Sequence, residues 1–150
     1  MRVVGGGWRM IPMVSVLAAL ALQAASGGWT WSLYEGDGPL VLANDIPDTA
    51  ELRATLQCQP GSGAVTVSVY GPPVSAGFAR ITAGGATAAS QARVGRDGKL
   101  EAGIPVGHPA FSAFVADGRM TIAVGDDVRS ITVERPHLAK LRRFADRCAG

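Results

Sequence analysis

The feature that most constrains the fold is a pair of alternating segments joined by a short turn. Between residues 51 and 59, every second side chain is apolar or a cysteine: Leu52, Ala54, Leu56 and Cys58. Residues 65–70 alternate in the same way, and a Pro-Gly-Ser-Gly turn at 60–63 separates the two segments. Because side chains alternate between the two faces of a strand, this pattern predicts an antiparallel hairpin with one buried face. It also predicts that Cys58 points inward.

The rest of the chain continues the β pattern. Further apolar or alternating segments, separated by turns rich in Gly and Asp, lie at 40–43, 78–83, 87–94, 100–104, 120–124 and 130–134. The segment 87–94 is the weakest of these, since it consists mostly of Ala, Ser and Gln. Residues 44–48, which include Pro47, are expected to form a loop. The sequence therefore predicts a mainly β domain, either an antiparallel β-sandwich or a barrel-like sheet.

A short helix is expected near residues 109–117. Phe111, Phe114 and Val115 have helical spacing, with Pro109 suited to the first helical position and Gly118 to the end. The Asp-Gly pair at 117–118 also suits a tight hairpin turn, which is the alternative.

The last element is expected to be an amphipathic helix that begins at Pro136. Its apolar side chains fall on one side of a helical wheel: Leu138, Leu141, Phe144, Ala145 and Cys148. Lys140, Arg143 and Arg147 fall on the other side and are expected to face away from the core.

Cys58 and Cys148 are the two cysteines of the chain, and both are predicted to point inward. In an oxidising compartment such a pair tends to form a disulfide, which here would pin the last helix to the hairpin. Closing a loop of about 90 residues stabilises a fold by roughly 4–5 kcal/mol at most. The alternative is two unrelated buried thiols.

The first 26 residues have the order of an export signal. Arg2 and Arg9 form a basic start, an apolar run at 10–22 follows, and small residues lie at 24–27. We expect cleavage near Ser26, which leaves a single domain at 27–150 that does not span the membrane and is periplasmic or secreted. The alternative is an uncleaved anchor over residues 3–25, which would place Arg9 in the hydrocarbon.

Removing the signal also changes the charge. The chain has 14 Lys and Arg against 12 Asp and Glu, so without Arg2 and Arg9 the two signs balance at 12 each. A neutral domain has no overall field that attracts nucleic acid, so nucleic acid is not an expected partner.

No catalytic, cofactor-binding or metal-ligating motif stands out. His108 and His137 each lie next to a proline at an expected helix start, which favours capping or surface roles. Asp126-Asp127 is more typical of an exposed turn than of a cation site. An acid/base pair would need Asp45 and Asp48 to meet Glu51, or Asp117 to meet His108, which one sequence cannot show.

The candidate partner-binding residues are two tryptophans and a basic face. Trp29 and Trp31 form a binding platform or belong to the core. From Arg135 onward five basic residues oppose Asp146, so Lys140, Arg143 and Arg147 either contact an anionic partner or form a solvated outer face.

The order of features resembles a known type of exported protein. These features are Trp29, a hairpin with Cys58 at the end of its first strand, Phe111–Val115 before a strand at Met120–Val124, and a last helix with Leu141, Phe144 and Cys148. The arrangement is similar to the invasion-associated locus B family and the related type VI secretion accessory proteins. This resemblance implies a periplasmic, β-sandwich-like domain with a C-terminal helix and a disulfide, and it offers no catalytic residue.

Together these observations predict an exported, non-enzymatic envelope protein that binds a partner or supports an envelope assembly. The expected partner is an envelope protein or an anionic surface. The alternatives are a small periplasmic hydrolase with an unrecognised site and a signal-anchored inner-membrane protein.

Overall fold

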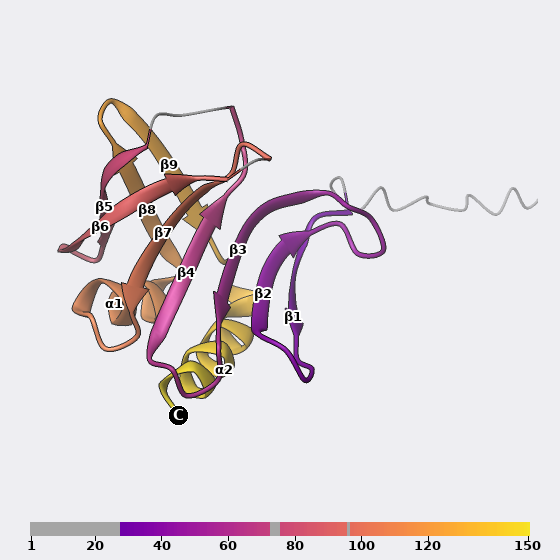
Figure 1. Ribbon diagram of the computed structural model, residues 1–150. Coiled ribbons are helices and arrows are strands. Elements are labelled where there is room, and N and C mark those ends of the chain that lie inside the picture. The colour runs from indigo at the N-terminus through magenta and orange to yellow at the C-terminus, as the bar shows by residue number, and fades with distance from the viewer. Residues whose placement is uncertain (1–27, 73–75, 96) are drawn as a thin grey trace, which may run out of the picture.

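Nine antiparallel strands form one curled sheet with the shape of a half-barrel, and two short helices pack against it (Figure 1). The computed structural model describes residues 28–72, 76–95 and 97–150, and these counts refer to them. The expected signal at 1–26 lies outside the described residues. The strand order is β1-β2-β3-β4-β7-β6-β5-β8-β9, so the mainly β prediction is confirmed.

The strands are β1 (Thr30–Tyr34), β2 (Leu40–Asp45), β3 (Leu52–Cys58), β4 (Ala64–Val69), β5 (Gly77–Ala83), β6 (Ala86–Val94), β7 (Leu100–Pro105), β8 (Arg119–Val124) and β9 (Asp127–Thr132). The helices are α1 (Pro109–Asp117) and α2 (Leu138–Ala149), and a 3₁₀ turn at Arg135–His137 leads into α2.

The predicted hairpin is present as β3 and β4. The two strands pair antiparallel, with Leu56 opposite Val67. Ala54, Leu56 and Cys58 are buried, whereas Arg53 before them and Gln57 between the last two are exposed. The alternation in the sequence therefore fixes which face of this hairpin enters the core.

Strand β6 joins the two parts of the sheet. It pairs with β5 along most of its length and with β7 only at Arg93 and Val94. The sequence makes this segment look like a weak strand, yet with 9 residues it is the longest one described. Its inward-facing Ala88 and Ala92 are buried, and these small side chains let α1 pack closely over β5 and β6. At Gly84, in the β5–β6 turn, a Cβ would lie 2.8 Å from Cβ of Ala113 in α1.

The loop predicted at 44–48 is wrong for its first two residues. Strand β2 continues through Asp45, which pairs with Thr30 of β1 and is only 5% exposed. A carboxylate is tolerated there because the hydroxyls of Ser32 and Tyr34 both donate hydrogen bonds to it.

Helix α1 is confirmed, and the tight hairpin at 117–118 is wrong. His108 caps its start, where Nδ1 accepts from the backbone N–H of Ala110 at 3.0 Å. Gly118 ends it in the left-handed conformation, with φ of 75°, and its N–H bonds back to the carbonyl of Phe114.

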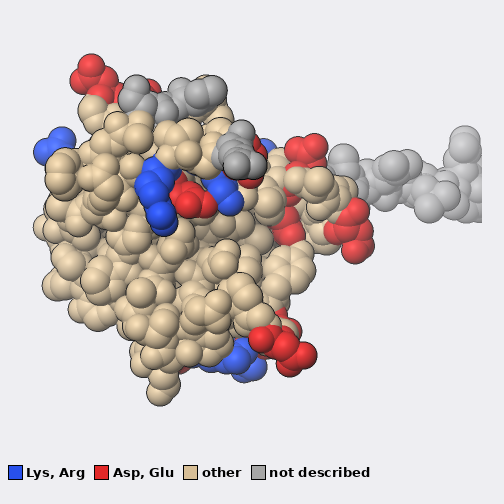
Figure 2. Space-filling model, in the orientation of Figure 1, with Lys and Arg blue, Asp and Glu red and all other residues tan. Residues whose placement is uncertain are grey.

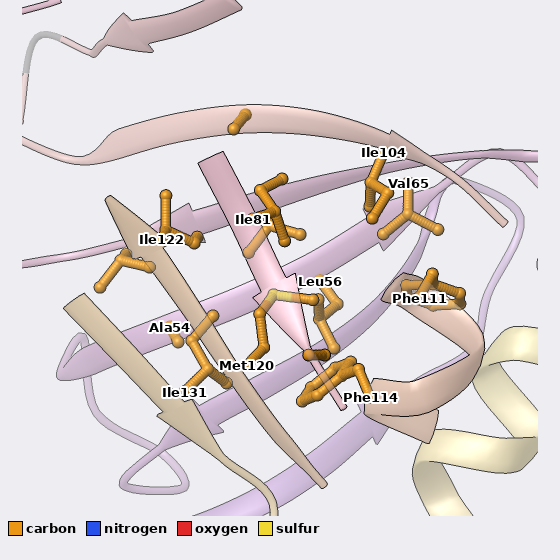
Figure 3. Close-up of a cluster of buried hydrophobic side chains, with 14 of the residues drawn as sticks. Ala54, Leu56, Val65, Ile81, Ile104, Phe111, Phe114, Met120, Ile122 and Ile131 are labelled. Atoms are coloured by element: carbon orange, nitrogen blue, oxygen red, sulfur yellow. The ribbon is translucent and has the colours of Figure 1, made fainter. Parts of the chain in front are cut away.

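The core lies inside the curl of the sheet. Figure 3 shows side chains from both parts of the sheet, among them Leu56, Val65, Ile81 and Ile122, gathered in one cluster with Phe114 of α1. All five are at most 1% exposed. One apolar cluster therefore holds both parts of the sheet together.

The two edge strands, β1 and β9, are not paired with each other. Side chains cross the opening between the two parts of the sheet instead. The indole N–H of Trp31 in β1 donates to the carbonyl of Thr132 in β9 at 3.0 Å. Arg129 of β9 donates to the carbonyls of Val69 and Pro72. An inward-pointing charge on an edge strand is a common way to prevent pairing with another chain.

The predicted disulfide is present and pins α2 to the sheet. Cys58 at the end of β3 is bonded to Cys148 in the last turn of α2, with 5.9 Å between their Cα atoms. Beside it, the N–H groups of Gly61 and Gly63 donate to the carbonyls of Arg147 and Cys148 at 3.0 and 2.9 Å. These bonds satisfy carbonyls that have no partner within the helix.

Candidate functional site: the basic face of helix α2

Helix α2 presents arginines outward because its opposite face is locked into the core. Leu141, Phe144 and Cys148 are fully buried. They pack the helix against β1, β2, β4 and α1. The helical repeat then turns Arg143 outward and leaves Arg147 half-buried at the side.

Two of these arginines bind one carboxylate. Arg143 Nε lies 2.8 Å from Oε1 of Glu35, and Arg143 Nη2 lies 3.3 Å from Oε2. Arg147 Nη1 donates to the same Oε1 at 2.9 Å. Glu35 lies in the turn between β1 and β2, so the site joins the two ends of the described chain. Figure 2 shows basic and acidic side chains side by side at the lower edge of the molecule, where α2 meets this turn.

The electrostatics of the pair follow from its geometry. Hydrogen bonds from Arg143, and then from Arg147, lower the pKa of Glu35 below its ordinary value. In return, the hydrogen bond to Glu35 raises the pKa of Arg143. Two guanidinium groups against one carboxylate leave one positive charge uncompensated at this point.

An open hollow of about 500 Å³ lies along the same face, lined by Ala139, Arg142, Arg143, Asp146 and Arg147. We call it the arginine hollow. Its three guanidinium groups face two carboxylates, Asp146 in the lining and Glu35 beside it, so one positive charge remains. Such a charge suits a carboxylate or another anion, because a guanidinium offers paired donors in a planar arrangement. Arg142 was not among the predicted site residues. Arg142 directly precedes Arg143 in the sequence, and both side chains are exposed.

Lys140 does not belong to the outward face, so that prediction is wrong for this residue. Its side chain is half-buried, and Nζ donates to the backbone carbonyl of Trp31 at 2.7 Å. Nζ also lies 3.4 Å from Nδ1 of His137. The long lysine stem lets the ammonium group reach the edge of β1, so Lys140 has a structural contact.

The two tryptophans do not form a shared platform. Trp31 is 1% exposed and lies in the core, which excludes it as a surface contact. Trp29 precedes β1 and is half-buried, with the guanidinium carbon of Arg53 at 4.0 Å from its ring centroid. Strand β1 begins at Thr30, so Trp29 lies outside it and does not share a strand face with Trp31.

Of the acid/base pairings that the sequence left open, that of His108 with Asp117 does not assemble. His108 and Asp117 lie at opposite ends of α1, and nine residues of helix separate them by roughly 13 Å. Asp45 binds Ser32 and Tyr34. Among the described residues, no group of three or more His, Cys, Asp or Glu side chains is arranged to hold a metal ion.

The Asp45 cluster itself was not predicted. Ser32 and Tyr34 lie two residues apart on one face of β1, which is the only sequence signal for it. The hydrogen bond to Asp45, followed by desolvation, raises the pKa of the half-exposed Tyr34. This cluster satisfies the hydrogen-bonding needs of a buried carboxylate.

No family model, curated protein or solved structure matches the chain. Within the described residues, no helix is both long and apolar enough to cross a membrane.

Proposed function

We propose that the protein is an exported, non-enzymatic envelope protein that binds an acidic partner protein through the arginine hollow of α2. The single observation that carries this proposal is the Cys58–Cys148 disulfide. Disulfides persist in oxidising compartments and are rare in the cytosol, and the export-like order of residues 1–26 agrees with that location.

The basic face supports the choice of partner. The described part of α2 ends in exposed arginines that already bind one carboxylate, that of Glu35. A partner with surface carboxylates would meet Arg142, which does not bind Glu35, together with the neighbouring Arg143. Such contacts raise association rates more than affinity, so binding should weaken as the salt concentration rises.

The first experiment tests export. Mass spectrometry of the protein purified from fractionated cells should show a mature chain that starts near residue 27, in the periplasmic or secreted fraction. Thiol trapping on lysis should find no reactive cysteine. A protein in the cytosolic fraction with two free thiols would refute the proposal, and an intact N-terminus in the membrane fraction would identify a signal-anchored protein.

The second experiment tests the binding surface. A photo-crosslinking residue at Ala139, which lines the arginine hollow, should capture an envelope protein in intact cells. The crosslink should disappear in Arg142→Gln/Arg143→Gln. Arg80→Gln/Arg93→Gln, which removes the same charge from exposed positions on β5 and β6, is the matched control and should keep it. Equal crosslinking in both variants would exclude the basic face as the binding surface.

A further inference from the structure

A larger hollow lies where α1 ends and the chain leaves β9, next to the start of α2. Its volume is about 640 Å³, and its lining includes Asp117, Arg119, Glu134 and Arg135, with Leu138 as an apolar element. These residues come from the end of α1, the start of β8 and the segment that leads into α2. We call this hollow the charged groove.

The four charges of the groove have no structural partner among the described residues. All four side chains are exposed, and none takes part in an ion pair or a side-chain hydrogen bond there. Asp117 is also at the C-terminal end of α1, where the helix dipole disfavours a negative charge. Asp117 is therefore placed against the local stability of α1, and such a local conflict is expected at functional sites.

A row of hydroxyl groups extends the groove across the sheet. A second hollow of about 300 Å³ shares Gly84, Arg119 and Thr132 with the first and adds Thr82, Thr121 and Ser130. The last three are direct neighbours across β5, β8 and β9, since Thr82 pairs with Thr121 and Thr121 with Ser130. A hydroxyl both donates and accepts, so this row can serve either the N–H or the C=O groups of a ligand.

The composition of the groove distinguishes between ligand classes. No aromatic side chain lines either hollow, so there is no surface on which a base or a sugar ring would stack. The two arginines are balanced by two carboxylates, so a phosphate polymer gains no net attraction. A peptide with free ammonium and carboxylate groups meets both signs at once, and its backbone suits the hydroxyl row.

We propose that the charged groove binds short peptides that carry both ammonium and carboxylate groups. Arg119 and Arg135 bind the carboxylates of the peptide, and Asp117 and Glu134 bind its ammonium groups. Thr121 and Ser130 bind its backbone. This site does not depend on the arginine hollow, so it stands whether or not α2 binds a protein partner.

The test is a titration of the ¹⁵N-labelled mature protein with the tripeptide Lys-Ala-Glu, followed by NMR. Saturable shifts are expected at the amides of Thr121, Ser130 and Thr132, with a dissociation constant below ~1 mM at low salt. Asp117→Asn/Glu134→Gln and Arg119→Gln/Arg135→Gln should each weaken binding about tenfold. The matched control Arg143→Gln/Asp146→Asn, in the arginine hollow, should leave the affinity unchanged.

Three results would overturn the inference. The first is the absence of saturable shifts at these amides up to about 10 mM peptide, well above typical ligand affinities. The second is unchanged affinity in both groove variants, with folding verified by circular dichroism. The third is equal binding of acetylated and amidated Lys-Ala-Lys or Glu-Ala-Glu, because a ligand of one sign would then suffice.

Discussion

Helices α1 and α2 cover the same sheet but differ in almost every chemical property. Helix α1 has no charged residue before Asp117 at its last position, whereas five of the 12 residues of α2 are charged. Helix α1 is capped at both ends by its own neighbours, His108 and Gly118. No side-chain cap bond begins α2.

The two helices are correspondingly held in different ways. Helix α1 is held by burial: Phe111 and Phe114 are at most 1% exposed, and the small residues of β6 let it approach the sheet. Helix α2 adds long-range links to its buried face, namely the disulfide to Cys58, the bond from Lys140 to Trp31 and the ion pairs with Glu35. A helix of about a dozen residues is marginal on its own, so α2 depends on such links.

The comparison indicates that the two helices stabilise different parts of the fold. Helix α1 forms part of the central core, while α2 connects the last residues of the chain to β1, β3 and the β3–β4 turn. Loss of a contact in α1 should therefore weaken the whole fold, and loss of a link to α2 should act first on α2 itself.

The largest effect is expected for Phe114→Ala. Removing a fully buried aromatic side chain should lower the free energy of unfolding by about 3–5 kcal/mol, measured by urea denaturation. The matched control is Phe78→Ala, because Phe78 is 76% exposed and its loss should change stability by less than about 0.5 kcal/mol. Similar losses in both variants would mean that α1 does not organise the core.

Removal of the disulfide should have the next largest effect. Cys148→Ser should lower stability by roughly 2–5 kcal/mol. Hydrogen exchange should then rise first in α2 and only later in α1, because the disulfide holds α2 to the sheet and does not involve α1. Cys58→Ser should give the same pattern. Exchange that rises in both helices together would show that α2 does not open separately.

Lys140→Met should have an intermediate effect. The variant keeps most of the stem but removes the ammonium group that donates to the carbonyl of Trp31. Loss of a hydrogen bond from a charged, half-buried group should cost about 1–2 kcal/mol in urea denaturation. The control is Arg142→Met, at an exposed position of the same helix, which should cost less. Equal costs would contradict the structural role assigned to Lys140.

Loss of the cap of α1 should be a smaller effect. His108→Ala removes the acceptor for the N–H of Ala110 and should lower stability by about 1 kcal/mol. His137→Ala is the control, because His137 precedes α2 without a side-chain cap bond. If both variants lose the same stability in thermal denaturation, the cap does not contribute.

Local patterns predicted the elements of this fold well, and their failures have physical causes. The alternation of Leu52–Cys58 and the helical spacing of Phe111 and Phe114 each report on one element, and both predictions were confirmed. The spacing of apolar residues also placed Cys148 inward, which made the disulfide predictable. By contrast, the sequence of β6 predicts only a weak strand, because small alanines have low β-propensity. These alanines allow α1 to approach the sheet closely, and that tertiary contact cannot be read from the segment alone.

The candidate site was less predictable for the same reason. A helical wheel placed Lys140 on the basic side but could not show that its stem reaches back to Trp31. The wheel also gave no sign of Glu35, which is more than a hundred positions away from Arg143. The charged groove brings together residues from several elements, so no single sequence motif predicts it.

The smallest effect is expected for Arg143→Gln/Arg147→Gln, and it has a distinct pH signature. These ion pairs are exposed, so the melting temperature at neutral pH should hardly change. Because both arginines lower the pKa of Glu35, their contribution is present above the ordinary glutamate value of 4.5 and is lost as the pH falls through the lowered pKa. The two proteins should therefore differ slightly near neutral pH and converge in acid.

The direct measurement is an NMR titration of the Glu35 carboxyl group. In the double variant its pKa should rise towards the ordinary value, whereas Arg80→Gln/Arg93→Gln, as a control, should leave it lowered. An unchanged Glu35 pKa in the double variant would show that the arginines do not hold this carboxylate in solution. In that case the side-chain links of α2 to the sheet would be the disulfide and the bond from Lys140 to Trp31, and the contrast with α1 would depend on those two links.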